Sequence, residues 1–211
     1  MKNKLYTSIG LMSGTSMDGI DISIIQSDGQ YEFYNILDDY FEYDVYLQEE
    51  LIRLRDIILN QNDLLKNSKE LGSLERKITV FHAEKINQVL SKYKHQIDLI
   101  GFHGQTIFHD PQKKITKQLG DGKLLSQLLK KKVVYDFRQN DIKNNGQGAP
   151  LTPIFHYLIS NIINEKFKTG FPMGFINIGG ITNLTNIKSK SSNFEENVIA
   201  FDVGPGNCLI D

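Results

Sequence analysis

The chain has 211 residues, 24 Lys+Arg against 25 Asp+Glu, and 40% hydrophobic residues. This length suits one large domain or two small ones, and the charge balance leaves no basic stripe for nucleic acid or anionic lipid. The single cysteine, Cys208, excludes an internal disulfide. No apolar run approaches the roughly 20 residues of a membrane span, and the first ten residues lack a signal-peptide pattern, so we expect a cytoplasmic protein with no membrane partner.

The first half of the chain predicts three strands followed by helices. Short apolar or alternating segments place the strands at 5–11, 20–25 and 31–37. A small, glycine-containing loop, 12–19, separates the first two. From 46 to about 93 the apolar residues follow a 3.6-residue period, as in Leu51, Leu54 and Ile58, and the charged stretch 60–70 is the expected break between helices.

The second half alternates strands and helices. We expect a buried strand at 97–102, a short helix at 122–130, a strand at 133–137, a polar glycine-rich stretch at 138–150, a helix at 152–163, and strands at 174–178, 182–187 and 198–203. The opening order of strand, glycine loop, strand and strand recurs at 174–203. Two such modules outline an α/β, actin-like fold, in which each domain offers a hairpin loop to the phosphates of one nucleotide. We place the first domain at 1–140 and the second at 141–211.

The first loop is a candidate phosphate-binding loop. Small residues let backbone N–H groups approach an anion, hydroxyls add donors, and Asp18 or Asp21 could hold Mg²⁺ directly or through water. The loop is not a Walker motif, because no Gly-Lys-[Ser/Thr] occurs. The alternative is a plain hairpin turn with solvated polar residues.

The second module contains a paired glycine turn, Gly179 and Gly180, and an aspartate, Asp202, at a predicted strand end. Glycines are common in tight turns, so this pair alone does not indicate a binding loop. It becomes a candidate only because the strand–loop–strand order of the first module recurs around it. A carboxylate at a strand end, followed by glycines and an expected helix start, is where α/β proteins place catalytic groups. A helix N-cap or a turn carboxylate is the alternative for Asp202.

Polar residues also follow the two strands in the middle of the chain. Arg138 could clamp a carboxylate or phosphate, or could pair with Asp136 or Asp141 to fix its loop. His103 and Gln105 are candidates for hydrogen bonds to a polyol. Because His103 and His109 lack carboxylates or cysteines at ligand spacing, zinc is not expected.

Taken together, six stretches resemble the anhydro-N-acetylmuramic acid kinase family. They occur in the family's order across nearly the whole chain: residues 10–21 (GLMSGTSMDGID), 103–106 (HGQT), 136–138 (DFR) with Asp141, 146–151 (GQGAPL), 177–180 (NIGG) and 201–207 (FDVGPGN). Each motif alone is a weak signal, but six motifs in the family's order are a specific one.

The resemblance implies an actin-like (ribonuclease H-like) sugar kinase that uses ATP and Mg²⁺. Such a kinase converts 1,6-anhydro-N-acetylmuramate and water to N-acetylmuramate 6-phosphate and ADP in peptidoglycan recycling. By matching position, Asp202 would activate the water. Of the two loop carboxylates, Asp18 is the expected Mg²⁺ ligand. ATP would be bound by two loops: Gly14, Thr15, Ser16, Met17, Asp18, Gly19, Ile20 and Asp21 in one, Gly179 and Gly180 in the other. His103, Gln105, Thr106 and Arg138 would line the sugar side.

Family members are nearly twice this length, so the resemblance implies a complete first domain and a truncated second domain. One hypothesis is an active kinase, as a homodimer or completed by a separately encoded C-terminal half. The other is a non-catalytic remnant that binds sugar weakly at most.

Overall fold

The computed structural model describes residues 4–190 and 193–206. The chain divides into two compact units, Met1–Gly148 and Ala149–Asp211, and each is described by itself. The expected boundary at 140/141 falls inside helix α5 (Phe137–Lys143).

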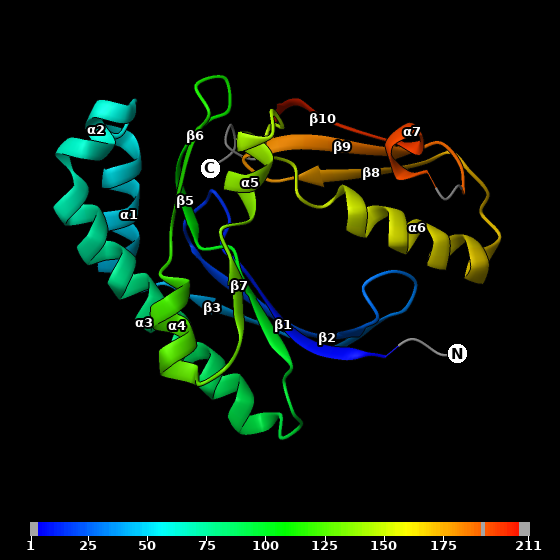
Figure 1. Cartoon of the computed structure of the whole chain (residues 1–211), viewed down its shortest axis with the longest axis horizontal. Coiled ribbons are helices and arrows are strands. Elements are labelled where there is room, and N and C mark those ends of the chain that lie inside the picture. The colour runs from blue at the N-terminus through cyan, green and yellow to red at the C-terminus, as the bar shows by residue number, and fades with distance from the viewer. Residues whose placement is uncertain (1–3, 191–192, 207–211) are drawn as a thin grey trace. The chain divides into compact units, whose positions relative to one another are not determined.

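Unit 1 is built on a five-stranded mixed sheet in the order β3-β2-β1-β4-β7 (Figure 1). Its strands are β1 (Tyr6–Met12), β2 (Gly19–Ser27), β3 (Phe33–Glu42), β4 (Leu99–Phe102) and β7 (Val133–Tyr135). The first three pair antiparallel, whereas β1, β4 and β7 run parallel to one another. All five strands are predicted by the sequence, although β3 begins later and runs further than the expected 31–37.

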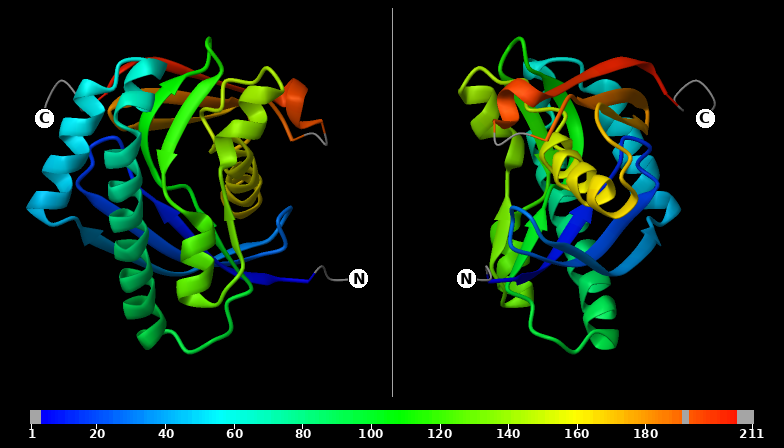
Figure 2. Two further views of the ribbon diagram at one scale, coloured as in Figure 1. Left: turned by 60° about the vertical axis from the view of Figure 1, so that its left-hand side comes forward. Right: turned by 90° about the vertical axis from the view of Figure 1, so that its right-hand side faces the viewer.

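One face of this sheet is covered by the helices α1 (Val45–Ile57), α3 (Ser68–Lys92) and α4 (Gly122–Leu129), and α3 and α4 lie side by side (Figure 2). The short helix α2 (Gln61–Lys66) packs against α3 and has no buried residue. The side chain of Asp44 caps α1 by accepting hydrogen bonds from the amides of Tyr46 and Leu47, at 3.1 and 3.0 Å. The predicted break at 60–70 contains the short α2 and the start of α3.

The core of unit 1 follows the two-residue period of its strands. Ile9 and Leu11 of β1 are buried, as are Ile20, Ile22 and Ile24 of β2, because alternate side chains point to the same face. They share one hydrophobic cluster with the 3.6-period residues of the helices: Leu47, Leu51, Leu54, Leu71, Leu74, Ile78, Ile86 and Val89. Burying one such side chain contributes roughly 1.5–3 kcal/mol.

Two elements of unit 1 are not anticipated by the sequence. The first is a hairpin of β5 (Gln105–Asp110) and β6 (Ile115–Leu119), and the second is the helix α5 in the stretch expected to be irregular. The turn of the hairpin contains Lys114 in the left-handed region, φ 57°, where lysine gives no sequence signal. Polar strands and a polar helix lack the apolar periodicity on which such predictions rest.

The described residues of unit 2 form an antiparallel sheet, β10-β9-β8, and two helices. Its elements are α6 (Pro153–Phe167), β8 (Met173–Ile178), β9 (Ile181–Ile187), the short α7 (Phe194–Asn197) and β10 (Val198–Pro205). His156 of α6 stacks on Phe175 of β8 and hydrogen-bonds the Thr185 hydroxyl of β9 at 2.8 Å, so α6 covers one face of the sheet. Among the helices of the described residues, none has the length and hydropathy needed to cross a membrane.

Candidate functional site

Three motif loops lie at one edge of the unit 1 sheet. The strands β1, β4 and β7 are parallel neighbours, so their carboxyl ends meet at that edge. The chain leaves β1 into the loop 13–18, leaves β4 at His103 and leaves β7 at Asp136. The carboxyl edge of parallel strands is where open α/β sheets bind ligands. The loop 13–18 thus lies next to His103, about 90 residues further along the chain, and His103 lies next to the loop at Asp136, about 30 residues beyond it.

The loop 13–18 is a tight turn. The Met17 amide donates to the Gly14 carbonyl at 3.3 Å, and Met17 has φ 57° with its side chain buried. The Ser16 hydroxyl donates to Oδ1 of Asp18 at 2.7 Å. Among the described residues, the backbone amides of Thr15 and Ser16 have no acceptor. Unused amides beside exposed hydroxyls are the donors that an anion needs.

A buried polar chain lies behind this loop, and sequence reasoning missed it. Tyr43 donates its hydroxyl to Oγ of Ser13 at 3.3 Å, and Oγ of Ser13 lies 3.4 Å from Nε2 of His82. Nδ1 of His82 lies 2.8 Å from the Ile78 carbonyl, so Nδ1 carries the proton and Nε2 accepts from Ser13. Burial lowers the pKa of His82 to about 4. The available signal was a histidine four residues after Ile78, on the apolar stripe of the helix.

Gln105 joins the loops after β1 and β4. Its Nε2 donates to the Gly14 carbonyl at 2.8 Å. Its Oε1 is buried, and no described residue donates to it. Thr106, next along the chain, accepts a 3.3 Å hydrogen bond from Gln118 of β6. Of the four expected sugar-side residues, Gln105 therefore orients the phosphate-loop candidate, and Thr106 lies within the β5–β6 hairpin.

His103 and Arg138 join the loops after β4 and β7. Nε of Arg138 donates to Nε2 of His103 at 2.9 Å, while Nδ1 of His103 donates to the Gly104 carbonyl at 2.6 Å. Both imidazole nitrogens are thus engaged, and the ring is held in its neutral form. Burial, together with the Arg138 charge, lowers the pKa of His103 to about 4. His103 is arranged to position Arg138 and has no nitrogen left for proton transfer.

The loop after α5 closes around Asp141. Oδ2 of Asp141 accepts the Gly148 amide at 2.6 Å, and a side chain at Gly146 would collide with this carboxylate. NH1 of Arg138 donates to the Gly148 carbonyl at 2.7 Å. The open alternative that Arg138 pairs with Asp136 or Asp141 is not what the structure has, since Asp141 fixes the loop through backbone contacts.

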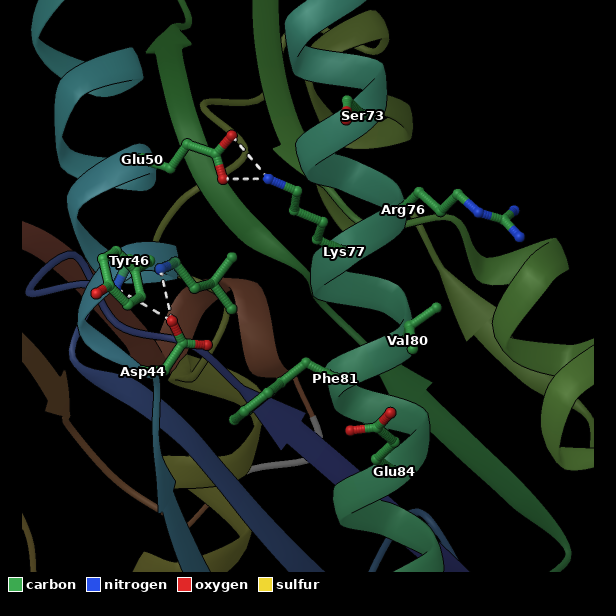
Figure 3. Close-up of a pocket in the computed structure, with 10 residues that line it drawn as sticks. Asp44, Tyr46, Glu50, Ser73, Arg76, Lys77, Val80, Phe81 and Glu84 are labelled. Atoms are coloured by element: carbon green, nitrogen blue, oxygen red, sulfur yellow. Dashed lines mark hydrogen bonds and ion pairs between the residues drawn. The ribbon is translucent and has the colours of Figure 1, made fainter.

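Two of the cavities formed by the described residues of unit 1 are compared as candidate sites. One, of about 280 Å³, is lined by residues around this edge, including His103, Gln118, Gly120, Asp136 and Gln139. The other, of about 490 Å³, lies between α1 and α3, and Figure 3 shows its lining. There, Lys77 pairs with Glu50 at 2.6 Å, and Asp44 is occupied as a helix cap. The larger hollow contains none of the motif residues, so the smaller one is the better candidate for a site.

Acidic residues cluster beside the phosphate-loop candidate. Partial burial, with Asp18 and Asp38 nearby, raises the pKa of the Asp21 carboxyl above its ordinary value. Within residues 4–190 and 193–206, no group of three or more His, Cys, Asp or Glu is arranged to hold a metal ion. Mg²⁺ is commonly held by one or two carboxylates, with water and substrate phosphates completing its shell. A single carboxylate such as that of Asp18 suits an Mg²⁺ ion whose other ligands are water and phosphate oxygens. It does not suit a site in which protein side chains supply all the ligands.

In unit 2, the second glycine loop and the end of β10 lie together. The Gly206 amide donates to the Gly180 carbonyl at 3.0 Å, and a Cβ at Gly206 would collide with the Gly179 carbonyl. Asp202 is exposed, and it pairs in register with Asn183 just before a bulge. Asp202 lies in a strand and not at a helix N-cap. The helix start expected after Gly206 lies outside the described residues.

These elements make the chain an α/β protein with a mixed sheet, a fold consistent with a sugar kinase domain. A solved structure of an exopolyphosphatase-like protein is similar, with a TM-score of 0.50 and 12% identity over 97% of this chain and 52% of that one. The family model described as anhydro-N-acetylmuramic acid kinase matches residues 6–211, and the chain belongs to that family.

Curated relatives agree with this assignment. Proteins named anhydro-N-acetylmuramic acid kinase are 55% identical in Pelagibacter ubique and 43% identical in Agrobacterium fabrum, each over 99% of this chain. One from Rhizobium etli is 39% identical over 97% of the chain. The chain covers 54%, 55% and 54% of these proteins, so it spans about half the length of the curated relatives it matches.

Proposed function

We propose that this chain supplies substrate-facing loops of an actin-like, ATP-dependent kinase. The kinase converts 1,6-anhydro-N-acetylmuramate and water to N-acetylmuramate 6-phosphate and ADP, in cytoplasmic peptidoglycan recycling. The proposal rests on two hydrogen bonds that link the motif loops at one edge of the sheet. Gln105 bonds to Gly14, and Arg138 bonds to His103. Family membership supports the identity of the reaction.

In this proposal, the loop 14–21 binds the ATP phosphates. The unused amides of Thr15 and Ser16 would donate to phosphate oxygens, with hydroxyls beside them. Asp18 would hold Mg²⁺, which neutralises charge on the transferring phosphoryl group when bound. Gly179 and Gly180 would offer backbone amides to nucleotide phosphates, and their lack of side chains permits close approach.

Asp202 is proposed as the general base. Its carboxylate would take a proton from water as the water oxygen bonds to C1 and the bond from C1 to the bridging oxygen breaks. The freed O6 then accepts the γ-phosphoryl group, and ADP leaves. Exposure of Asp202 at a bulge, with Gly204 and Gly206 after it, leaves room for a sugar.

The chain matches about half of each relative, so the turnover proposal concerns this chain together with a polypeptide that covers the rest of the family's length. A separately expressed C-terminal half and a homodimer are the two arrangements to compare. Size-exclusion chromatography with light scattering, on the chain alone and on the mixture, separates them.

The test is sugar phosphate formation by the mixture, followed by ³¹P NMR, with ¹⁸O-water to locate the new oxygen at C1. We expect Asp202→Asn to lower kcat by at least ~10²-fold while the nucleotide still binds. Glu165→Gln is the control, because Glu165 is an exposed unit 2 carboxylate that pairs only with Lys190 among the described residues. Undiminished turnover by Asp202→Asn, or no turnover by the unaltered mixture, would contradict the proposal.

A further inference from the structure

Tyr43 holds both ends of the loop 13–18. Its hydroxyl donates to Oγ of Ser13 at 3.3 Å, and its backbone amide donates to the Asp18 carbonyl at 2.8 Å. Tyr43 lies in the short connection between β3 and α1, and its side chain is buried. Its ring packs against that of Phe81 in α3, with the ring centroids 5.1 Å apart. Because the ring is packed on a helix of the core, it is a rigid support for the loop.

His82 accepts the hydroxyl hydrogen of Ser13. Nδ1 of His82 donates to the Ile78 carbonyl at 2.8 Å, so Nε2 presents a lone pair to Oγ of Ser13 at 3.4 Å. Burial lowers the pKa of His82 to about 4 and raises the pKa of the Tyr43 hydroxyl to about 12. At neutral pH the imidazole is therefore an acceptor and the phenol a donor. Ser13 accepts from Tyr43 and donates to His82, which leaves it no hydrogen to donate to a ligand.

The middle of the loop depends on such supports. Thr15 and Ser16 are exposed, and between the two ends the loop is anchored by the buried side chain of Met17 and by the bond from Gln105 to the Gly14 carbonyl. Small polar residues in water sample many backbone conformations, and ordering them when a ligand binds costs conformational entropy. A loop that is already ordered in the folded protein avoids this cost at the moment of binding.

We propose that Tyr43 and His82, acting through Ser13, are positioning residues that hold the loop 13–18 in its phosphate-binding conformation. This inference rests on the proposed function, which assigns the loop to the phosphates of ATP. Both side chains are buried behind the loop, so neither contacts the ligand. They increase the affinity of the loop for a polyphosphate, beyond any contribution to the stability of unit 1.

The experiment measures binding of Mg²⁺–tripolyphosphate to the 211-residue chain at neutral pH by isothermal titration calorimetry. This probe has the three linked phosphates of ATP and lacks the nucleoside. Tyr43→Phe removes only the hydroxyl and keeps the ring against Phe81. We expect its affinity for the probe to fall about three- to tenfold, which corresponds to the net value of one hydrogen bond.

Two substitutions of His82 separate its two nitrogens. The amide of asparagine can replace Nδ1 but does not reach the position of Nε2, so His82→Asn should weaken binding to a similar extent. Glutamine is one carbon longer and can present an acceptor near the position of Nε2, so His82→Gln should restore part of the affinity. The double variant Tyr43→Phe/His82→Asn should lose less than the product of the two single losses, because both act through the same Ser13 hydroxyl.

Thr79→Val is the matched control. Thr79 lies on the same helix α3 and is fully buried. Its hydroxyl donates to the Glu75 carbonyl at 2.7 Å and accepts the Asp121 amide at 2.9 Å, and neither partner belongs to the loop 13–18. Its loss should lower the stability of unit 1, as urea unfolding measures, and leave the affinity for tripolyphosphate unchanged.

A second measurement needs no variant. Backbone ¹⁵N relaxation reports the order of residues 14–17 on the picosecond to nanosecond timescale. In the unaltered chain without ligand, we expect these residues to be as ordered as the strands β1 and β2. The inference therefore stays testable even where the substitutions unfold the chain.

The outcomes that overturn the inference are distinguishable from failure of the proposed function. Unchanged affinity in both Tyr43→Phe and His82→Asn, an equal loss in Thr79→Val, or a disordered loop in the ligand-free chain refutes the positioning role and leaves the proposed kinase function standing. An ordered loop that does not bind Mg²⁺–tripolyphosphate in the unaltered chain refutes the assignment of the loop to phosphates, and this inference falls with it.

Discussion

The side-chain amide of Gln105 donates a 2.8 Å hydrogen bond to the carbonyl of Gly14, 91 residues earlier in the chain. The bond ties the loop after β4 to the phosphate-loop candidate after β1. Because Gln105 is fully buried, the bond is shielded from water. A substitution of Gln105 should therefore also alter the conformation of the phosphate-loop candidate at Gly14.

Replacement of Gln105 by glutamate should destabilise unit 1 by about 1–3 kcal/mol at neutral pH. The carboxylate cannot donate to the Gly14 carbonyl and is itself desolvated. As pH falls, the carboxyl becomes protonated and can donate, so the penalty should shrink. Urea denaturation of the variant and the unaltered chain at several pH values measures this difference.

Gln118→Glu is the control for that experiment. Gln118 lies on the neighbouring strand β6, is only partly buried, and bonds to the hydroxyls of Thr106 and Thr116. A hydroxyl can donate to a carboxylate, so the penalty here should be smaller. Equal penalties at both positions would contradict the importance of the Gly14 contact.

Stability should fall as pH drops from about 6.5 to about 4, and His82 is one reason. Its folded pKa is lowered to about 4 from 6.5, so the unfolded chain binds more protons in that window. The contribution is fully present above pH 6.5 and lost by pH 4, on the order of 3 kcal/mol. His103, with its pKa also lowered to about 4, adds in the same direction.

The His82 contribution is measured by comparing the pH slopes of variants. His82→Asn cannot gain the proton, so its unfolding free energy should vary less between pH 6.5 and 4, even if it is lower throughout. His95→Asn, at an exposed position, should keep the original slope. If the unfolding free energy of His82→Asn depended on pH as steeply as that of the unaltered protein, protonation of His82 would not be a cause of the pH dependence.

Two glycines should respond to alanine with opposite signs. At Gly19, a Cβ would collide with the Phe41 carbonyl and the Tyr40 ring, so Gly19→Ala should cost about 1–3 kcal/mol. At Gly72, within α3, a Cβ meets nothing within 4 Å, and Gly72→Ala should stabilise by about 0.5–1 kcal/mol. Thermal and urea unfolding of the two variants test this, and a stabilising Gly19→Ala would show that the β2–β3 contact is looser than described.

The ion pair between Glu50 and Lys77 should contribute little. It spans α1 and α3 at 2.6 Å, but the lysine side chain is 52% exposed. Exposed pairs are worth about 0–1 kcal/mol because water and salt screen them. Glu50→Gln should therefore change the unfolding free energy by less than about 0.5 kcal/mol, and a double-mutant cycle with Lys77→Met should give a small coupling energy that falls with salt. A coupling above about 2 kcal/mol would contradict this assignment.

Much of the fold is predictable because its signals are local. Alternation in Ile20, Ile22 and Ile24 predicts a half-buried strand, and the strand is observed. The β5–β6 hairpin is not predictable in the same way, since its strands are polar and its turn has lysine at positive φ. The helix α5 likewise starts after Asp136 at φ 61°, a backbone state that sequence seldom signals for aspartate.

By itself, the sequence determined the composition class, most of the strands and helices, and the order of six motifs, because these depend on residues close together in the chain. The tertiary structure alone decided which motifs are neighbours, since the parallel order of β1, β4 and β7 is a long-range choice. It also decided what each side chain does there. Gln105 donates to a backbone carbonyl, and His103 is neutral and engaged at both nitrogens. Arg138 has neither Asp136 nor Asp141, the two acids that the sequence offered as partners, in an ion pair, and Asp141 accepts a backbone amide of its own loop instead.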